Sequence, residues 1–487
     1  MKKNIHILIF AIITPVIFLL MFVHQGAKSE SKNTKTPGYI IIAWNDLGMH
    51  CANKFFGNFS VLPPYNNHHA QVILVGDVSN LPQILTTGYH VTYEIPGNTY
   101  SVGKTDFWSY VNHLFGVTLV NNIGLTGVGL TGTMSKTGNF FHVEGIPITP
   151  YPDSDLVNEH PYQLTLIKVY DTTNNLLAST QSVIPVSNEF NCVSSGCHSS
   201  ELQILNMHEP VPGFNPANAP ILCAGCHKDN ALGLPGAVGV PAFSQVVHQK
   251  HGSETNDCYK CHPGPNTQCF RDIMKQGGMV CQDCHGTVAN VGNTIDNGRE
   301  AWLQEPDCGT SYCHGASHAS EPGTLFRNSK GHGNLYCSVC HGSPHAIVPT
   351  LQANDNLQNI TLQGYPGTLN KCVVCHGVNP TGSGPHGIYA TAIEYDQDLP
   401  MESGLGDICP NPVITTTTIN FSLSAEAKVT LELFNNEGQY IRKFMDRRLK
   451  TGSYSVIINS GEIPAGTYFL RLIAEDKTFS KKLLILK

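Results

Sequence analysis

The chain has 487 residues, enough for about three domains, and carries a formal net charge of −7 with only 13% charged residues. Its low charge and 46 glycines exclude a helical bundle and an acidic disordered chain. We expect no nucleic-acid partner, because no basic patch is available to neutralise phosphates.

The N-terminus has the pattern of a secretory signal over residues 1–27. Lys2 and Lys3 precede an apolar run from Ile5 to Val23. That run is also long enough to span a bilayer, so an uncleaved membrane anchor is the alternative. A polar linker over residues 28–37 follows. Export would place the cysteines in an oxidising compartment.

Residues 38–187 alternate short apolar runs with Gly, Asn and Pro, which predicts a β-rich, sandwich-like or barrel domain. The predicted strands are 39–43, 71–75, 90–94 and 162–170. Two loops of this region contain His50, Cys51, His68 and His69. These side chains are candidates for a copper or zinc site, a haem ligand or a contact surface. The alternative is ordinary interface polarity with Cys51 in a disulfide.

Residues 188–400 contain one short motif seven times. Five copies read C-x-x-C-H, and two copies have four residues between the cysteines. C-x-x-C-H is the attachment motif of haem c: two thiols on one turn reach the porphyrin vinyl groups, and the next histidine lies under the iron. The alternative is structural zinc, which also uses paired cysteines. The predicted attachment cysteines are Cys192, Cys197, Cys223, Cys226, Cys258, Cys261, Cys281, Cys284, Cys308, Cys313, Cys337, Cys340, Cys372 and Cys375. The predicted proximal ligands are His198, His227, His262, His285, His314, His341 and His376.

Seven further histidines lie between Asn188 and Asp407, one for each motif: His208, His248, His251, His318, His332, His345 and His386. We predict that they are the second axial ligands, so that every haem iron is held by two imidazoles. His318 and His345 follow a motif histidine by four residues, too close to reach the other face of the same porphyrin, so each should serve a neighbouring haem. Met207, Met274 and Met279 are the alternative axial ligands.

We expect sparse regular structure here, because porphyrins take the place of a side-chain core. Helices are predicted over residues 200–208 and 243–251, and the second places His248 and His251 on one side. Three cysteines lie outside the motifs: Cys51, Cys269 and Cys409. A Cys51–Cys269 disulfide that joins the β-rich domain to the motif region is a hypothesis.

The motif region resembles the multihaem c-type cytochromes of bacteria that respire extracellular acceptors, in motifs such as Cys337-Ser-Val-Cys-His-Gly-Ser-Pro-His345. The resemblance implies seven covalent haem c groups. It also implies redox partner proteins or an extracellular acceptor, and self-association into filaments.

Residues 401–487 alternate apolar and polar residues around hairpin turns, which predicts a small Ig-like β-sandwich. This tail resembles the C-terminal sorting domain of type IX secretion, in its Cys409-Pro-Asn-Pro412 opening, its Gly466-Thr-Tyr-Phe-Leu-Arg-Leu472 strand and its Lys-rich end. The resemblance implies interaction with the type IX machinery and a location at the outer cell surface or outside the cell. The alternative is an ordinary accessory β-domain.

Together these patterns predict an exported heptahaem cytochrome that conducts electrons at or outside the outer membrane, an electron carrier without catalytic residues. Two imidazoles per iron leave no coordination position for a substrate. The alternatives are an oxidoreductase of a small nitrogen or sulfur compound with one open haem, and a surface-binding module whose haems only connect it electrically.

Overall fold

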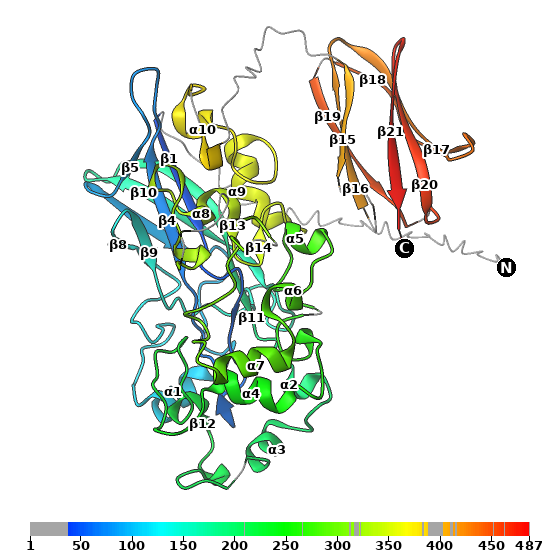
Figure 1. The fold of residues 1–487 in the computed structure, drawn as a ribbon. Coiled ribbons are helices and arrows are strands. Elements are labelled where there is room, and N and C mark those ends of the chain that lie inside the picture. The colour runs from blue at the N-terminus through cyan, green and yellow to red at the C-terminus, as the bar shows by residue number, and fades with distance from the viewer. Residues whose placement is uncertain are drawn as a thin grey trace, which may run out of the picture.

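The computed structural model describes residues 38–208, 210–264, 266–310, 313–315, 321, 323–381, 384–387, 403–409, 413, 416–450, 452–461 and 463–486. The predicted signal and linker, His318 and the Pro410–Pro412 opening lie outside these residues, as does the side chain of Cys409. Within them the chain is multidomain and β-rich with short helices, as predicted (Figure 1).

The β-rich domain consists of two five-stranded sheets that pack face to face. The first has the order β1 (Tyr39–Trp44), β4 (His68–Leu74), β9 (Phe140–Val143), β8 (Ser135–Thr137), with β5 (Gln83–Leu85) paired to β4. The second has the order β2 (His50–Cys51), β11 (Leu176–Ser187), β10 (Tyr162–Asp171), β6 (Tyr89–Glu94), β7 (Thr131–Thr133). Side chains of both sheets form one hydrophobic core. The four predicted strands are present as β1, β4, β6 and β10, and the other strands of these sheets and the helix α1 (Phe107–Phe115) were not predicted.

Strand β1 is buried on both faces, which explains its uninterrupted apolar sequence. Ile41 and Ala43 face the core between the sheets, whereas Ile42 and Trp44 pack against the motif region. β1 is also an edge strand, and Gln358 covers that edge: its side-chain amide bonds both the N–H (2.8 Å) and the C=O (2.9 Å) of Ala43. The motif region therefore completes the first sheet.

The motif region contains short helices and turns connected by loops (Figure 1). It also has two small strand pairs. In the first, β12 (Ile221–Leu222) pairs with β3 (Phe59–Ser60) of the β-rich domain, and in the second, β13 (Gly342–Ser343) pairs with β14 (Ala346–Ile347). The α-helices are α2 (Asn191–Ser194), α3 (Glu201–Asn206), α4 (Phe243–His251), α5 (Ile273–Gln276), α6 (Cys281–His285), α7 (Val288–Asp296), α8 (Cys337–His341), α9 (Ala353–Gln363) and α10 (Val373–His376). The 3-10 turns are η1 (Pro216–Asn218), η2 (Cys223–Gly225), η3 (Cys258–Lys260), η5 (Phe326–Asn328), η6 (His332–Asn334) and η7 (Pro385–Gly387).

A buried ion pair within the motif region is bonded to the β-rich domain through its arginine. The Arg271 guanidinium donates to both carboxylate oxygens of Asp355, at 2.6 and 2.8 Å, and to the carbonyl of Gly48 at 2.6 Å. It also lies over the ring of Tyr162, 4.7 Å from the ring centroid. Arg271 is only 1% exposed. This pair lies close to the place where the Cys51–Cys269 disulfide was expected.

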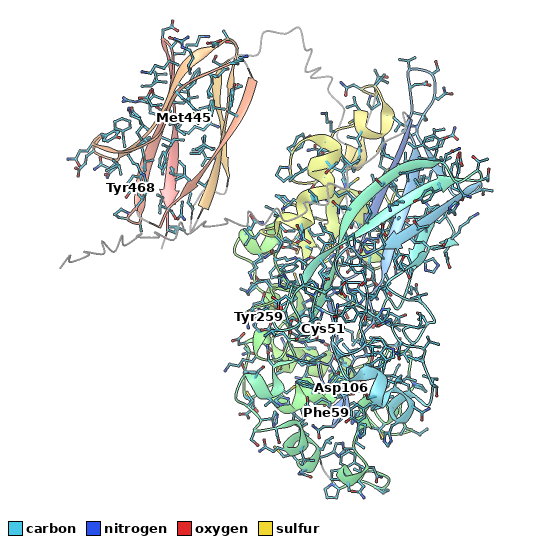
Figure 2. All side chains as sticks on the ribbon, turned by 180° about the vertical axis from the view of Figure 1, so that it is seen from behind. Cys51, Phe59, Asp106, Tyr259, Met445 and Tyr468 are labelled. Carbon is cyan, nitrogen blue, oxygen red and sulfur yellow. The ribbon has the colours of Figure 1, made fainter. Side chains whose placement is uncertain are left out.

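The expected disulfide is not formed, because Cys51 and Cys269 are both free thiols. Their side chains are close enough to interact electrostatically. Burial raises the pKa of both thiols, to about 11 for Cys269. Figure 2 shows Cys51 and Tyr259 near the middle of the larger body, and Phe59 and Asp106 below them. Arg271 joins the motif region to the β-rich domain instead, through its bond to Gly48.

The C-terminal domain is a small β-sandwich, as predicted. Its three-stranded sheet has the order β15 (Gly404–Cys409), β16 (Thr416–Leu423), β19 (Gly452–Asn459), and its four-stranded sheet the order β18 (Tyr440–Leu449), β17 (Ala427–Asn435), β20 (Gly466–Ala474), β21 (Lys477–Ile485). The inward residues of alternate positions form the core, with Leu431, Leu433, Leu470 and Leu472 fully buried. β15 and β18 were not predicted.

Candidate haem sites

Each short C-x-x-C-H motif folds as a single tight turn. The histidine amide returns to the carbonyl of the first cysteine, from His227 to Cys223 at 3.0 Å, from His262 to Cys258 at 2.8 Å and from His376 to Cys372 at 2.9 Å. The other two short motifs are the one-turn helices α6 and α8. A turn of this kind brings both thiols and the imidazole to one side of the chain.

The two wider motifs close with the same hydrogen bond. The amide of His198 donates to the carbonyl of Cys192 at 3.1 Å, and the amide of His314 donates to that of Cys308 at 3.2 Å. The hydrogen bond between the histidine and the first cysteine is therefore the same as in the short motifs. This geometry supports grouping all seven motifs as one kind of site.

The structure places six of the seven spare histidines beside a motif histidine, with interplanar angles from 27° to 79°. The ring centroids are 5.9 to 6.2 Å apart in all six pairs. The pairs are His198–His251, His227–His208, His262–His248, His285–His345, His376–His332 and His341–His386. The seventh motif histidine, His314, is described, but His318 lies outside the described residues.

This separation is the one expected for two imidazoles on a single metal ion. A metal lies about 2 Å from an imidazole nitrogen, which is itself about 1 Å from the ring centroid, so the two centroids should be about 6 Å apart. An ordinary aromatic contact also falls in this range. It does not explain why every pair joins one motif histidine to one spare histidine. The methionine alternative is not needed at these six sites.

His345 pairs with a motif other than its own, as its position in the sequence requires. Its partner is His285, whereas His341 of the adjacent motif faces His386. On α4, His248 and His251 likewise face the histidines of two different motifs. One short segment thus contributes to two sites, which ties neighbouring sites together.

Backbone carbonyls orient several of the imidazoles. The Nδ1 atoms of His227, His248 and His251 donate to main-chain carbonyls at 2.8, 2.6 and 2.8 Å, from Pro241, Ser244 and Val247. Because a carbonyl only accepts, Nδ1 carries the proton and Nε2 is left as the metal-binding nitrogen. These carbonyls were not foreseen, although for the two α4 histidines they are the residues four positions earlier in a predicted helix.

Desolvation by surrounding atoms favours the neutral form of six of the twelve paired imidazoles, although His262, His285 and His345 are exposed. It lowers the pKa of His262 and of His345 to about 4, with nearby histidines adding to the effect. Desolvation shifts the pKa of His248, His285, His341 and His376 in the same direction. The neutral ring is the form that coordinates a metal.

Residues 188–335 of the motif region have almost no side-chain core. Between residues 188 and 335 the buried hydrophobic residues described are Leu205, Ala224, Phe270 and Ile295, and they form no cluster. A stretch of this length cannot offset its loss of conformational entropy with so little buried apolar surface. Large apolar groups held between the histidine pairs would supply the missing core, so these residues fit haem.

The copper or zinc site suggested in the β-rich domain is wrong for the residues described, where no three or more His, Cys, Asp or Glu side chains are grouped to hold a metal ion. His50 instead bonds Asp46 at 2.7 Å. His68 and His69 are consecutive in β4, so they point to opposite faces of the sheet. His69 faces the motif region, packed edge-on against Trp44.

Within the described part of the chain, no helix has both the length and the apolar character needed to cross a membrane. No curated protein matches the sequence. The structure of dimeric latent PorU from Porphyromonas gingivalis is similar at 10% identity with a TM-score of 0.16, over 92% of this chain and 34% of that one. The chain thus spans about a third of PorU, and a TM-score this low supports no inference about fold.

One family model matches, that of the secretion system C-terminal sorting domain, over residues 407–486. The match covers β16 to β21, the sandwich described above. It agrees with the resemblance seen in the sequence of the tail and replaces the alternative of an ordinary accessory domain. The chain therefore carries a type IX C-terminal sorting domain, and the protein is exported to the cell surface or beyond it.

Proposed function

We propose that the protein is an exported heptahaem c-type cytochrome that conducts electrons at or outside the outer membrane. The observation that carries this proposal is the set of six histidine pairs, each with one motif histidine and with centroids 5.9 to 6.2 Å apart. The near absence of a side-chain core over residues 188–335 is the second support. The sorting domain accounts for the location.

The chain's own residues have three tasks in this function. The fourteen motif cysteines would hold seven haems by thioether bonds, and the six histidine pairs would supply two imidazoles to each of six irons. When bound, haem c supplies one-electron transfer between the ferric and ferrous states. Two imidazoles per iron exclude substrate from the metal and favour a low potential, because the methionine that raises it is missing.

Redox partner proteins or an extracellular acceptor would exchange electrons with such a protein, and the sorting domain would engage the type IX machinery before that. An oxidoreductase acting on a small nitrogen or sulfur compound would need one iron with an open position. Carbon monoxide distinguishes the two functions, because it binds only ferrous iron with a free or weakly held position.

The test uses the full mature protein and two variants. Pyridine haemochrome and intact mass should give seven haems per chain, and the reduced protein should bind no stoichiometric carbon monoxide. His208→Ala removes the exposed partner of His227 and should create one equivalent of carbon monoxide binding. His113→Ala, an exposed histidine of α1 far from any motif in the sequence, is the matched control and should create none.

Two results would overturn the proposal. The first is a haem content well below seven per chain. The second is stoichiometric carbon monoxide binding by the unmodified protein, which would favour the oxidoreductase instead.

A further inference from the structure

The seven motifs are neighbours in one particular order. For each neighbouring pair of motifs, a cysteine of one is close enough to a cysteine of the next to interact electrostatically. These cross-motif pairs are Cys223–Cys192, Cys192–Cys261, Cys258–Cys281, Cys284–Cys308, Cys308–Cys337 and Cys340–Cys375. These six links join the seven motifs end to end.

Direct contacts support the links along this path. The side-chain amide of Asn191, next to Cys192, donates to the carbonyls of His262 and Gly264 at 3.3 and 3.1 Å. At the other end, the Leu369 amide donates to the carbonyl of Cys340 at 2.9 Å, just before the Cys372 motif. Cys340 and Cys375 also pack on the same hydrophobic cluster.

The histidine pairs follow the same path. α4 supplies His251 to the Cys192 site and His248 to the Cys258 site, two consecutive positions. His262 of the Cys258 site also interacts electrostatically with His285 of the Cys281 site. His341 of the Cys337 site interacts in the same way with His314 of the Cys308 site.

We infer that the chain arranges its haem sites in one unbranched row, in the order Cys223, Cys192, Cys258, Cys281, Cys308, Cys337 and Cys372, with electrons entering and leaving at the Cys223 and Cys372 sites. The inference rests on the proposed function and adds the route and its two ends. The order follows the sequence except that the first two motifs are exchanged.

Both ends of this row are attached to the β-rich domain. At the Cys223 end, β12 pairs with β3, and the Ile221 amide donates to the carbonyl of Asn58 at 2.9 Å. At the Cys372 end, the Gly76 amide donates to the carbonyl of Cys375 at 2.8 Å. Figure 1 shows α10 and β12 at opposite ends of the motif region, with the sheets alongside. The β-rich domain thus spans the whole row.

The Cys223 end is open to solvent. Cys226 and His208 are both exposed, and the loop that follows carries the fully exposed Val238. An electron can therefore be delivered at this end without passing through protein.

The first test locates the irons directly. Anomalous diffraction from crystals of the full mature protein should give seven iron positions whose nearest neighbours follow the order above. A different order, or one iron with three equivalent neighbours, would overturn the row. Fewer than seven irons would instead contradict the proposed function, so the two failures are distinguishable.

The second test follows an electron injected at one end. A ruthenium photoreductant on Val238→Cys delivers it beside the Cys223 site, and flash photolysis measures how much returns to the oxidised label. Removing the Cys192 haem with Cys192→Ala and Cys197→Ala should trap the electron and make its return dominant. Removing the Cys372 haem in the same way should leave the escape unchanged. Equal effects of the two variants would overturn the row.

Discussion

Replacing Arg271 by Met should destabilise the protein strongly. The arginine is 1% exposed, and its partner Asp355 has a side chain only 6% exposed. The change removes two charge-assisted hydrogen bonds of 2.6 and 2.8 Å and leaves the carboxylate without its cation. It also leaves the carbonyl of Gly48, in the β-rich domain, without its donor.

The expected loss is about 3–5 kcal/mol of unfolding free energy, the usual cost of removing one partner of a buried ion pair. Most of that cost is the uncompensated carboxylate rather than the attraction itself. A double variant, Arg271→Met with Asp355→Leu, should therefore recover most of the loss. The same change at an exposed pair should cost less than about 1 kcal/mol.

Urea unfolding of the haem-loaded protein, followed by far-ultraviolet circular dichroism, measures these differences. Lys168→Met is the control, because Lys168 bonds Glu94 at a comparable 2.6 Å with both side chains partly exposed. The reasoning fails if Arg271→Met costs no more than the control. It also fails if the double variant is no more stable than the single one.

Three further predictions concern other parts of the molecule. Gly48→Ala should lower the unfolding free energy by well over roughly 1–2 kcal/mol, the penalty of a left-handed residue, because its Cβ would collide with the carbonyl of Pro344. The control Gly88→Ala is also at positive φ but has open space around it, so it should cost only that penalty. Equal losses of unfolding free energy in the two variants would contradict the packing argument. Burial favours a raised pKa for Asp153, but hydrogen bonds from Lys104 and Thr99 lower that pKa below 3.8. The contribution of Asp153 to stability is therefore full above that pH and is lost as the pH falls. Asp153→Asn should weaken the loss of unfolding free energy at acid pH, and an unchanged acid dependence would contradict this. Deleting the C-terminal domain should leave the haem-loaded protein in the periplasm by cell fractionation, and undiminished surface exposure would exclude a sorting role.

Local signals in the sequence were sufficient to predict the motif turns and the helix α4. The predicted helix over residues 243–251 has the same bounds in the structure, with its two histidines three residues apart and both in use. The stereochemical rule that a histidine four residues after its motif must serve another site also agrees with the pairing of His345. Which partner it meets depends on the tertiary fold, and no pattern within the chain contains that information.

The features that the sequence did not predict also depend on contacts between distant parts of the chain. β11 contains Ser, Thr, Gln and a proline, so its alternation is weak; its register with β10 stabilises it. Arg271 and Asp355 are 84 residues apart, and neither position carries a local sign of burial. The suggested copper or zinc site is wrong because His68 and His69 are adjacent residues of β4 and point to opposite faces of the sheet. The predicted strand began at residue 71, three residues later than β4, so both histidines were expected in a loop.

The attachment of β12 and Cys375 to the β-rich domain has a consequence for variation in this protein. The length of the folded β-rich domain does not depend on the lengths of the loops between motifs. Insertions or deletions in those loops can then be absorbed as surface bulges, while the positions of the first and last sites stay where β3 and the end of β4 hold them.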